Sequence, residues 1–107
     1  MTAKRRTRDV GAILERIIGD DPELRRRIEQ ETVSSHVASL IYEARERARL
    51  TQGELAKLVG TTQSAIARLE SADYRGHSLS MLVRIASALG ASVEVRLVPR
   101  SKRRRSA

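Results

Sequence analysis

Residues 50–71 read LTQGELAKLVGTTQSAIARLES, a pattern that predicts two short helices joined by a tight turn. Thr51 stands three residues before Glu54, which is the spacing of a capping box that closes the N-terminus of a helix. Gly60 follows the last apolar residue of that helix, and glycine readily takes the left-handed backbone conformation that a tight turn demands. A second helix is expected after Thr62, so the chain turns sharply between the two.

The second helix has an aliphatic face and an opposite face of small and polar side chains. The inward positions are Ala65, Ile66 and Leu69, and the outward positions are Gln63, Ser64, Ala67 and Arg68. Such a helix fits a major groove about 12 Å wide, where Arg can pair with guanine and Gln with adenine. Gln52, at the start of the preceding helix, can add a phosphate contact beside free backbone N–H groups. The pattern predicts binding to double-stranded DNA, and the alternative is a plain helical bundle.

This stretch resembles the helix-turn-helix of the phage repressor and Cro proteins, the Xre type, and the likeness runs from about Leu40 to Leu89. The resemblance implies that Arg45 and Glu70 pair within the core of the domain. It also implies a set of DNA-facing side chains, among them two threonines on phosphates: Gln52, Thr61, Thr62, Gln63, Ser64 and Arg68. Any one of the base-reading candidates can instead touch only phosphate or water.

Further helices are expected on both sides of this pair. One ends near Arg49, and the run Thr32–Ser35 predicts a break before it. Its apolar stripe consists of Val37, Leu40, Ile41, Ala44 and Ala48. Ser78 and Gly90 are the expected cap and stop of a last helix over 79–89. The expected fold class is therefore mainly α, a repressor-like domain of five or more helices with an N-terminal helical extension and one C-terminal strand.

That strand is expected over residues 91–98, ASVEVRLV, where apolar and polar side chains alternate. One isolated strand is not stable, whereas two copies centred on Val95 would match opposite charges and apolar side chains across a twofold axis. The expected dimer residues are Val93, Glu94, Val95, Arg96 and Leu97. The alternatives are pairing within one chain, for example with residues 32–37, or addition to the sheet of a partner.

The N-terminal part carries two more helical patterns, one over 9–18 and one that starts at Asp21. The first has a dense apolar face and is too short to be stable alone, so that face needs a cover. Residues 9–31 hold seven acids and four bases, a balance that suits a basic partner. The expected contacts with that partner are Val10, Ile13, Leu14, Ile17, Ile18, Asp20, Asp21 and Glu23. The alternative is that these helices pack back on the domain and enlarge its core.

The flanks of the domain carry a second resemblance. Residues 21–30, DPELRRRIEQ, and residues 89–99, LGASVEVRLVP, resemble the HigA-type antitoxins of bacterial toxin–antitoxin pairs. This resemblance implies an antitoxin that binds and silences a small basic ribonuclease toxin of the RelE/HigB class and represses its own operon. Two other readings are a stand-alone Xre-family regulator without a toxin, and a protein adaptor that no longer reads DNA.

Charge is concentrated in the two tails. The net charge is +8, yet nine of the 21 basic residues lie in 1–8 and 100–107, so the other 12 face 13 acids. Such tails bind polyanions without sequence preference, or stay disordered as solubilising ends. The predicted organisation is a basic arm (1–8), a helical extension (9–36), a helix-turn-helix domain (37–90), a dimerisation strand (91–99) and a basic tail (100–107).

Composition argues against several other classes of protein. The chain has no cysteine, which removes disulfides and thiolate metal sites, and His36 and His77 stand alone without ligand spacing. No apolar run is long enough for a membrane span or a signal segment. No catalytic grouping and no glycine-rich phosphate loop is visible. We expect a cytoplasmic protein that is not an enzyme, holds no cofactor or metal, and takes no small-molecule substrate.

Overall fold

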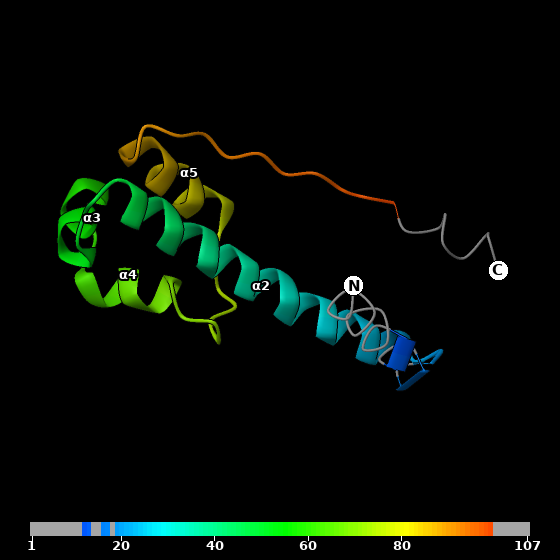
Figure 1. Ribbon diagram of the computed structural model, residues 1–107. Helices are drawn as coiled ribbons and strands as arrows, with labels where there is room; N and C mark the ends of the chain where they lie inside the picture. The colour runs from blue at the N-terminus through cyan, green and yellow to red at the C-terminus, as the bar shows by residue number, and fades with distance from the viewer. Residues whose placement is uncertain (1–11, 14–15, 18, 100–107) are drawn as a thin grey trace, which may run out of the picture.

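The computed structural model describes residues 12–13, 16–17 and 19–99, and four named α-helices lie in this part of the chain (Figure 1). They are α2 (Pro22–Arg47), α3 (Gln52–Val59), α4 (Gln63–Leu69) and α5 (Leu79–Ala88). The three short helices gather around the C-terminal half of α2, and its N-terminal half projects away from them (Figure 1). The described fold is mainly α, as expected, with four such helices where five or more were expected.

Helix α2 is one continuous helix of 26 residues, about 39 Å long at 1.5 Å per residue. Asp21 caps its start, because the carboxylate accepts hydrogen bonds from the backbone N–H groups of Glu23 and Leu24, each at 3.1 Å. The predicted break over 32–35 is wrong. The Thr32 hydroxyl donates to the carbonyl of Ile28 at 2.9 Å, so this short polar side chain is satisfied within the helix.

The face that α2 buries agrees with the predicted stripe only in part: Ile41 is buried and Val37 packs against the core. Its buried residues are Ser34, Ala38, Ile41 and Arg45, which share one side of the helix at spacings of four, three and four. Leu40, which the stripe placed inside, is 51% exposed, and Ala48 is exposed as well. Two small residues leave room for close packing on this side, and the charged Arg45 is buried because it has a partner within the domain.

The turn between α3 and α4 follows the local signals of the sequence. The capping box is confirmed: the N–H of Glu54 donates to the Thr51 hydroxyl at 3.0 Å, and the N–H of Thr51 donates to the Glu54 carboxylate at 2.8 Å. Gly60 ends α3 in the left-handed region with φ +83°, as predicted. Thr62 then caps α4, its hydroxyl accepting from the N–H of Ala65 at 3.1 Å. These contacts fix the direction in which α4 leaves the turn.

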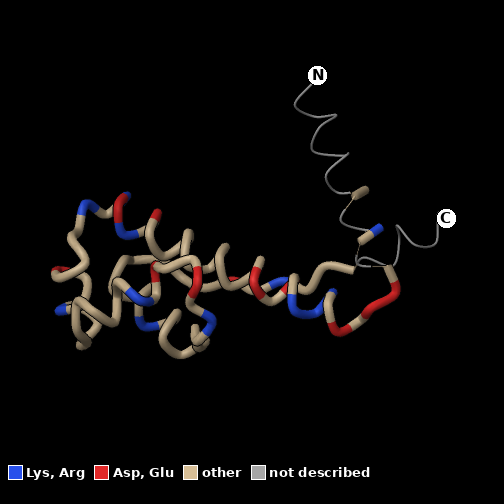
Figure 2. The backbone as a smooth tube through the Cα atoms, turned by 90° about the horizontal axis from the view of Figure 1, so that it is seen from below, with Lys and Arg blue, Asp and Glu red and all other residues tan. Residues whose placement is uncertain are grey.

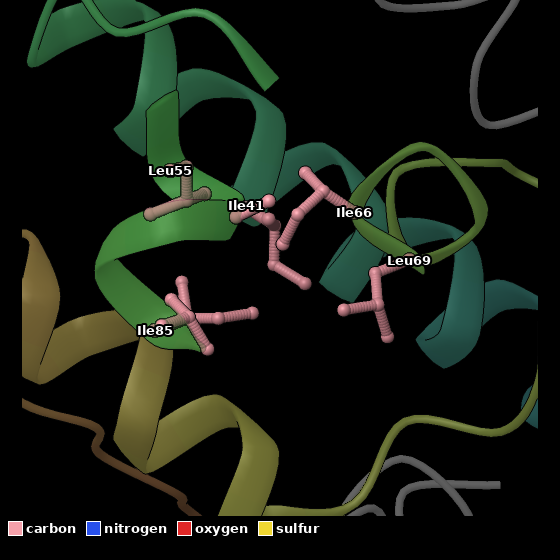
Figure 3. Close-up of a cluster of buried hydrophobic side chains, with 7 residues drawn as sticks. Ile41, Leu55, Ile66, Leu69 and Ile85 are labelled. Atoms are coloured by element: carbon pink, nitrogen blue, oxygen red, sulfur yellow. The ribbon is translucent and has the colours of Figure 1, made fainter. Parts of the chain in front are cut away.

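The core of the domain is aliphatic, and it lies where α2, α3, α4 and α5 meet (Figure 3). Its buried members are Ile41, Leu55, Ala56, Val59, Ile66, Leu69 and Ile85. Leu55 and Ile66 are completely shielded from solvent. Burial of one such side chain is worth about 1.5–3 kcal/mol, so this small cluster holds the three short helices on α2.

Beyond Gly90 the chain runs as an extended segment alongside α2 (Figure 1). No strand is formed within one chain by the described residues, so the strand expected over 91–98 is not seen here. The alternative in which it pairs with residues 32–37 is wrong, because those residues belong to α2. The segment leaves apolar side chains in solvent, with Val95 67% exposed and Leu97 94% exposed.

Several expectations fall on residues outside the described part of the chain. They are the two basic tails (1–8 and 100–107) and most of the helix over 9–18, with Val10, Leu14 and Ile18. Residues 12–13 and 16–17 are helical, and Ile13 and Ile17 are 50% and 66% exposed. No helix among the described residues is both long and apolar enough to span a bilayer.

Candidate nucleic-acid interface

Helix α4 lies at the surface of the domain and presents its polar face to solvent. Gln63, Ser64 and Arg68 are exposed, while Ile66 and Leu69 on the opposite side are buried in the core. This division follows from the helical period, since the two sets of residues lie on different faces of the same two turns. The outward face is therefore free to enter the major groove of a DNA duplex.

The turn before α4 adds polar groups beside that face. Thr62 is exposed and Thr61 is half-buried. The Thr62 oxygen accepts the capping hydrogen bond of α4, so its hydroxyl proton remains available as a donor. A hydroxyl donor at the N-terminus of a helix is well placed for a phosphate oxygen, because the helix dipole favours negative charge there.

A buried ion pair lies directly behind this surface. Arg45 donates from Nε to Glu70 Oε2 at 2.7 Å and from Nη2 to Glu70 Oε1 at 3.1 Å, and the two side chains are only 8% and 5% exposed. Arg45 also donates from Nη1 to the carbonyl of Leu50 at 2.7 Å and lies 5.4 Å from the ring centre of Tyr42. The hydrogen bonds to Glu70 raise the pKa of Arg45, so the guanidinium stays charged. The pair joins α2 to the end of α4.

The same carboxylate also binds Gln52, which in turn binds Gln63, and the sequence places both glutamines against DNA. Gln52 donates from Nε2 to Glu70 Oε1 at 3.1 Å, and Gln63 donates from Nε2 to Gln52 Oε1 at 2.9 Å. The four polar side chains thus form one chain of hydrogen bonds that starts at Arg45 and reaches the first residue of α4. Gln52 and Gln63 are oriented before any ligand arrives, which lowers the entropy that binding must spend on them.

Two further side chains support the interface, and reasoning from the sequence missed both. Arg84 donates from Nη2 to the carbonyl of Val59 at 2.6 Å, at the end of α3. His77 places Nε2 2.8 Å from the carbonyl of Leu69, at the end of α4, with its ring edge-on to Tyr74 at a centroid distance of 5.0 Å. Basic side chains commonly satisfy the last carbonyls of a helix, but nothing local in the sequence tells which helix end a residue on α5 will reach.

The residues predicted to bind a protein partner lie at the other end of the molecule. Ile13, Ile17, Asp20, Asp21 and Glu23 are all exposed. They belong to the segment that leads into α2 and to its first turn, at the end of α2 that lies away from α4 (Figure 1). Figure 2 shows acidic and basic residues following one another along this projecting half of α2. Asp21 also has a structural role here as the cap of α2. Among the described residues, no group of three or more His, Cys, Asp or Glu side chains could hold a metal ion.

The comparisons with known proteins agree with this geometry. Residues 41–95, half of the chain, match the Helix-turn-helix family. The protein therefore belongs to this family, in its Xre-like form, whose fold binds double-stranded DNA. The match includes all of α3, α4 and α5, the ion pair and the glutamines. No curated protein matches the chain.

Solved structures of one enzyme are similar to part of the chain. They include hydroxypropylphosphonic acid epoxidase (HppE) from S. wedmorenis and the Fe(II) and apo forms of HppE. Each has a TM-score of 0.51 and 34% sequence identity over 55% of this chain, and the match covers 31–33% of the HppE chain. The chain thus spans about a third of the length of these structures, and the similarity concerns one part of the enzyme.

Proposed function

We propose that this protein is the antitoxin and autorepressor of a toxin–antitoxin pair, of the HigA type within the Xre-like helix-turn-helix proteins. It represses its own operon through α4, and its helical extension binds and neutralises a basic ribonuclease toxin of the RelE/HigB class. One observation carries the proposal: α4, with its exposed polar face, and the exposed apolar and acidic residues at the start of α2 lie toward opposite ends of that helix (Figure 1). A stand-alone Xre-family regulator would need only the surface on α4.

The DNA contacts follow from the exposed face of α4. Arg68 can donate two hydrogen bonds to the O6 and N7 atoms of guanine, and Gln63 can pair with the edge of adenine. Ser64 is short enough to let the helix backbone enter the groove. Thr62, with its free hydroxyl proton, and the N-terminus of α3 are placed for phosphate oxygens, which fix the register of the protein on the duplex.

The toxin contacts follow from the projecting extension. Ile13, Ile17 and Val33 are 50%, 66% and 54% exposed, and they lie among acidic residues. Apolar side chains gain free energy when a partner covers them, and nearby carboxylates attract and orient a basic partner. Asp20 and Glu23 are exposed acids close in sequence to Ile17, and neither of them is the cap of α2.

The proposal includes a homodimer, because a twofold pair would place two copies of α4 about one DNA turn, roughly 34 Å, apart. It includes no catalytic activity, cofactor or small-molecule substrate. A repressor works where the chromosome lies, and we therefore place the protein in the cytoplasm.

The test separates the two surfaces. In the variant Ile13→Asp with Ile17→Asp, we expect the affinity for the product of the adjacent gene to fall at least about 100-fold, since interface hot spots cost 2 kcal/mol or more each. Operator binding in a gel shift should not change. Leu79→Asp, at a residue that is 64% exposed on the DNA-binding domain, is the matched control and should leave toxin binding intact.

Two outcomes would contradict the proposal. Unchanged toxin affinity in the double variant would place the toxin elsewhere on the chain. If the wild-type chain binds its operator but not the adjacent gene product, the protein is a stand-alone regulator.

A further inference from the structure

An apolar groove of about 310 Å³ is open between α2, α5 and the start of the extended C-terminal segment. Leu40 and Ala44 line it from α2, Leu82 and Leu89 line it from α5, and Val93 lines it from the segment. Leu40 is 51% exposed, so this wall of α2 is not covered by the chain itself. Figure 1 shows the extended segment running alongside α2 beyond the end of α5.

The extended segment turns one apolar side toward this groove. Val93 is half-buried at the groove, and alternate residues of an extended chain point to the same side. Val95 and Leu97 therefore share the side of Val93, yet they are 67% and 94% exposed. In the single chain, Leu97 therefore has almost no apolar contact surface.

We propose that residues 93–97 of a second copy of this chain bind in the groove. There they lie over α2 and form, with the same segment of this chain, a two-stranded antiparallel ribbon. This inference rests on the homodimer of the proposed function and names the surface that the homodimer buries. With Val95 on the twofold axis, Leu97 of the partner subunit lies beside Val93 and enters the groove. By symmetry, Leu97 of this chain enters the groove of the partner, which accounts for its exposure in the single chain.

Charge complementarity favours a second copy over another occupant. In this register Glu94 lies opposite Arg96 of the partner subunit, and the pairing occurs twice. Both side chains are exposed in the single chain, and Glu94 and Arg47 stand at the rim of the groove. The ribbon would also pair the backbone groups of residues 92–98, which otherwise form an open edge.

Disulfide cross-linking tests the register, and because the chain has no cysteine, only the introduced thiol can form a disulfide. Opposite residues of an antiparallel pair have Cα atoms about 4.5–5.5 Å apart, within the range of a disulfide. Val95→Cys should give a covalent dimer under mild oxidation. Ser92→Cys is the matched control, because its two copies would lie about 20 Å apart along the ribbon at 3.4 Å per residue. A covalent dimer from Ser92→Cys, or none from Val95→Cys, would overturn the proposed ribbon.

The groove is tested by sedimentation equilibrium of the full chain. Leu40→Asp should weaken the dimer at least about 30-fold, the effect of losing one interface hot spot. Leu58→Asp is the control, because Leu58 is 60% exposed on α3 and does not line the groove. Equal dimerisation of both variants would remove the second copy from the groove.

These results can be told apart from a failure of the proposed function. A cross-linked Val95→Cys dimer that binds neither operator nor toxin would leave the interface in place and refute the function. If the protein binds its operator and Leu40→Asp does not weaken the dimer, the proposed function stands and the proposed interface is refuted.

Discussion

Removal of Glu70 tests the chain of hydrogen bonds behind the DNA-binding face. In the variant Glu70→Ala, the guanidinium of Arg45 keeps its buried position, with a side chain that is 8% exposed, but loses both hydrogen bonds to the carboxylate. The remaining partners of Arg45 are the carbonyl of Leu50 at 2.7 Å, the exposed carboxylate of Glu46 at 3.4 Å and the ring of Tyr42 at 5.4 Å. These contacts already exist in the wild-type chain, so they do not replace the lost bidentate ion pair.

The expected loss is large for a domain of this size. Removing one partner of a buried ion pair costs about 3–5 kcal/mol, because the other charge is left without compensation in a poorly solvated site. The contacts of Arg45 with Leu50 and Glu46 place Glu70→Ala at the lower end, about 3 kcal/mol. Small proteins are stable by only about 5–15 kcal/mol in total, so the variant should unfold at a much lower urea concentration.

The matched control is Glu31→Ala. Glu31 pairs with Arg75, but these two side chains are 55% and 49% exposed, and an exposed pair is worth about 0–1 kcal/mol. The double variant Arg45→Met with Glu70→Leu removes both charges at once. It should regain most of the stability that Glu70→Ala loses, because apolar replacements of a buried pair are often neutral or stabilising.

Urea unfolding followed by circular dichroism measures all three variants, with the slope of the transition as a check that the unfolded state is unchanged. If Glu70→Ala lowers the free energy of unfolding no more than Glu31→Ala does, the buried ion pair does not stabilise the domain as argued. If the double variant is as unstable as Glu70→Ala, the loss comes from shape and not from an uncompensated charge.

Two further predictions concern the turn and the face of α4. Arg68→Ala should weaken operator binding by about 1–3 kcal/mol and relax the sequence preference at one base pair. If binding instead weakens equally for all DNA sequences, and its salt dependence falls by about one charge, Arg68 contacts only phosphate. Gly60→Ala should destabilise the fold by about 1–2 kcal/mol in thermal unfolding, because φ is +83° and an added Cβ would stand 3.5 Å from Arg84. An unchanged melting temperature would show that the turn relaxes to another conformation.

Signals that act within a few residues could be predicted from the sequence. The capping box at Thr51, the left-handed stop at Gly60 and the cap at Thr62 each depend on hydrogen bonds or sterics among near neighbours. The exposed face of α4 follows from the helical period once its start is known. The start of α5 was predicted correctly for the same reason, because Ser78 caps it through the N–H of Met81 at 3.2 Å.

The errors came where distant segments meet. The run Thr32–Ser35 looked like a break because β-branched and hydroxyl residues are poor helix formers on their own. Within the folded chain, Ser34 is buried and Glu31 is tied to Arg75 of the loop after α4, so contacts across the fold outweigh a weak local preference.

The residues of the candidate site divide in the same way. The sequence by itself determined which face of α4 points outward and which polar residues that face carries, because both depend on spacing within two helical turns. The family resemblance already implied the pair of Arg45 with Glu70, and the structure contains it. Only the tertiary structure decided that Glu70 also accepts from Gln52, that Arg84 closes α3, and that an apolar groove opens beside α2. Those contacts join residues that are far apart in the chain, and packing selects their partners from many candidates that no local pattern can rank.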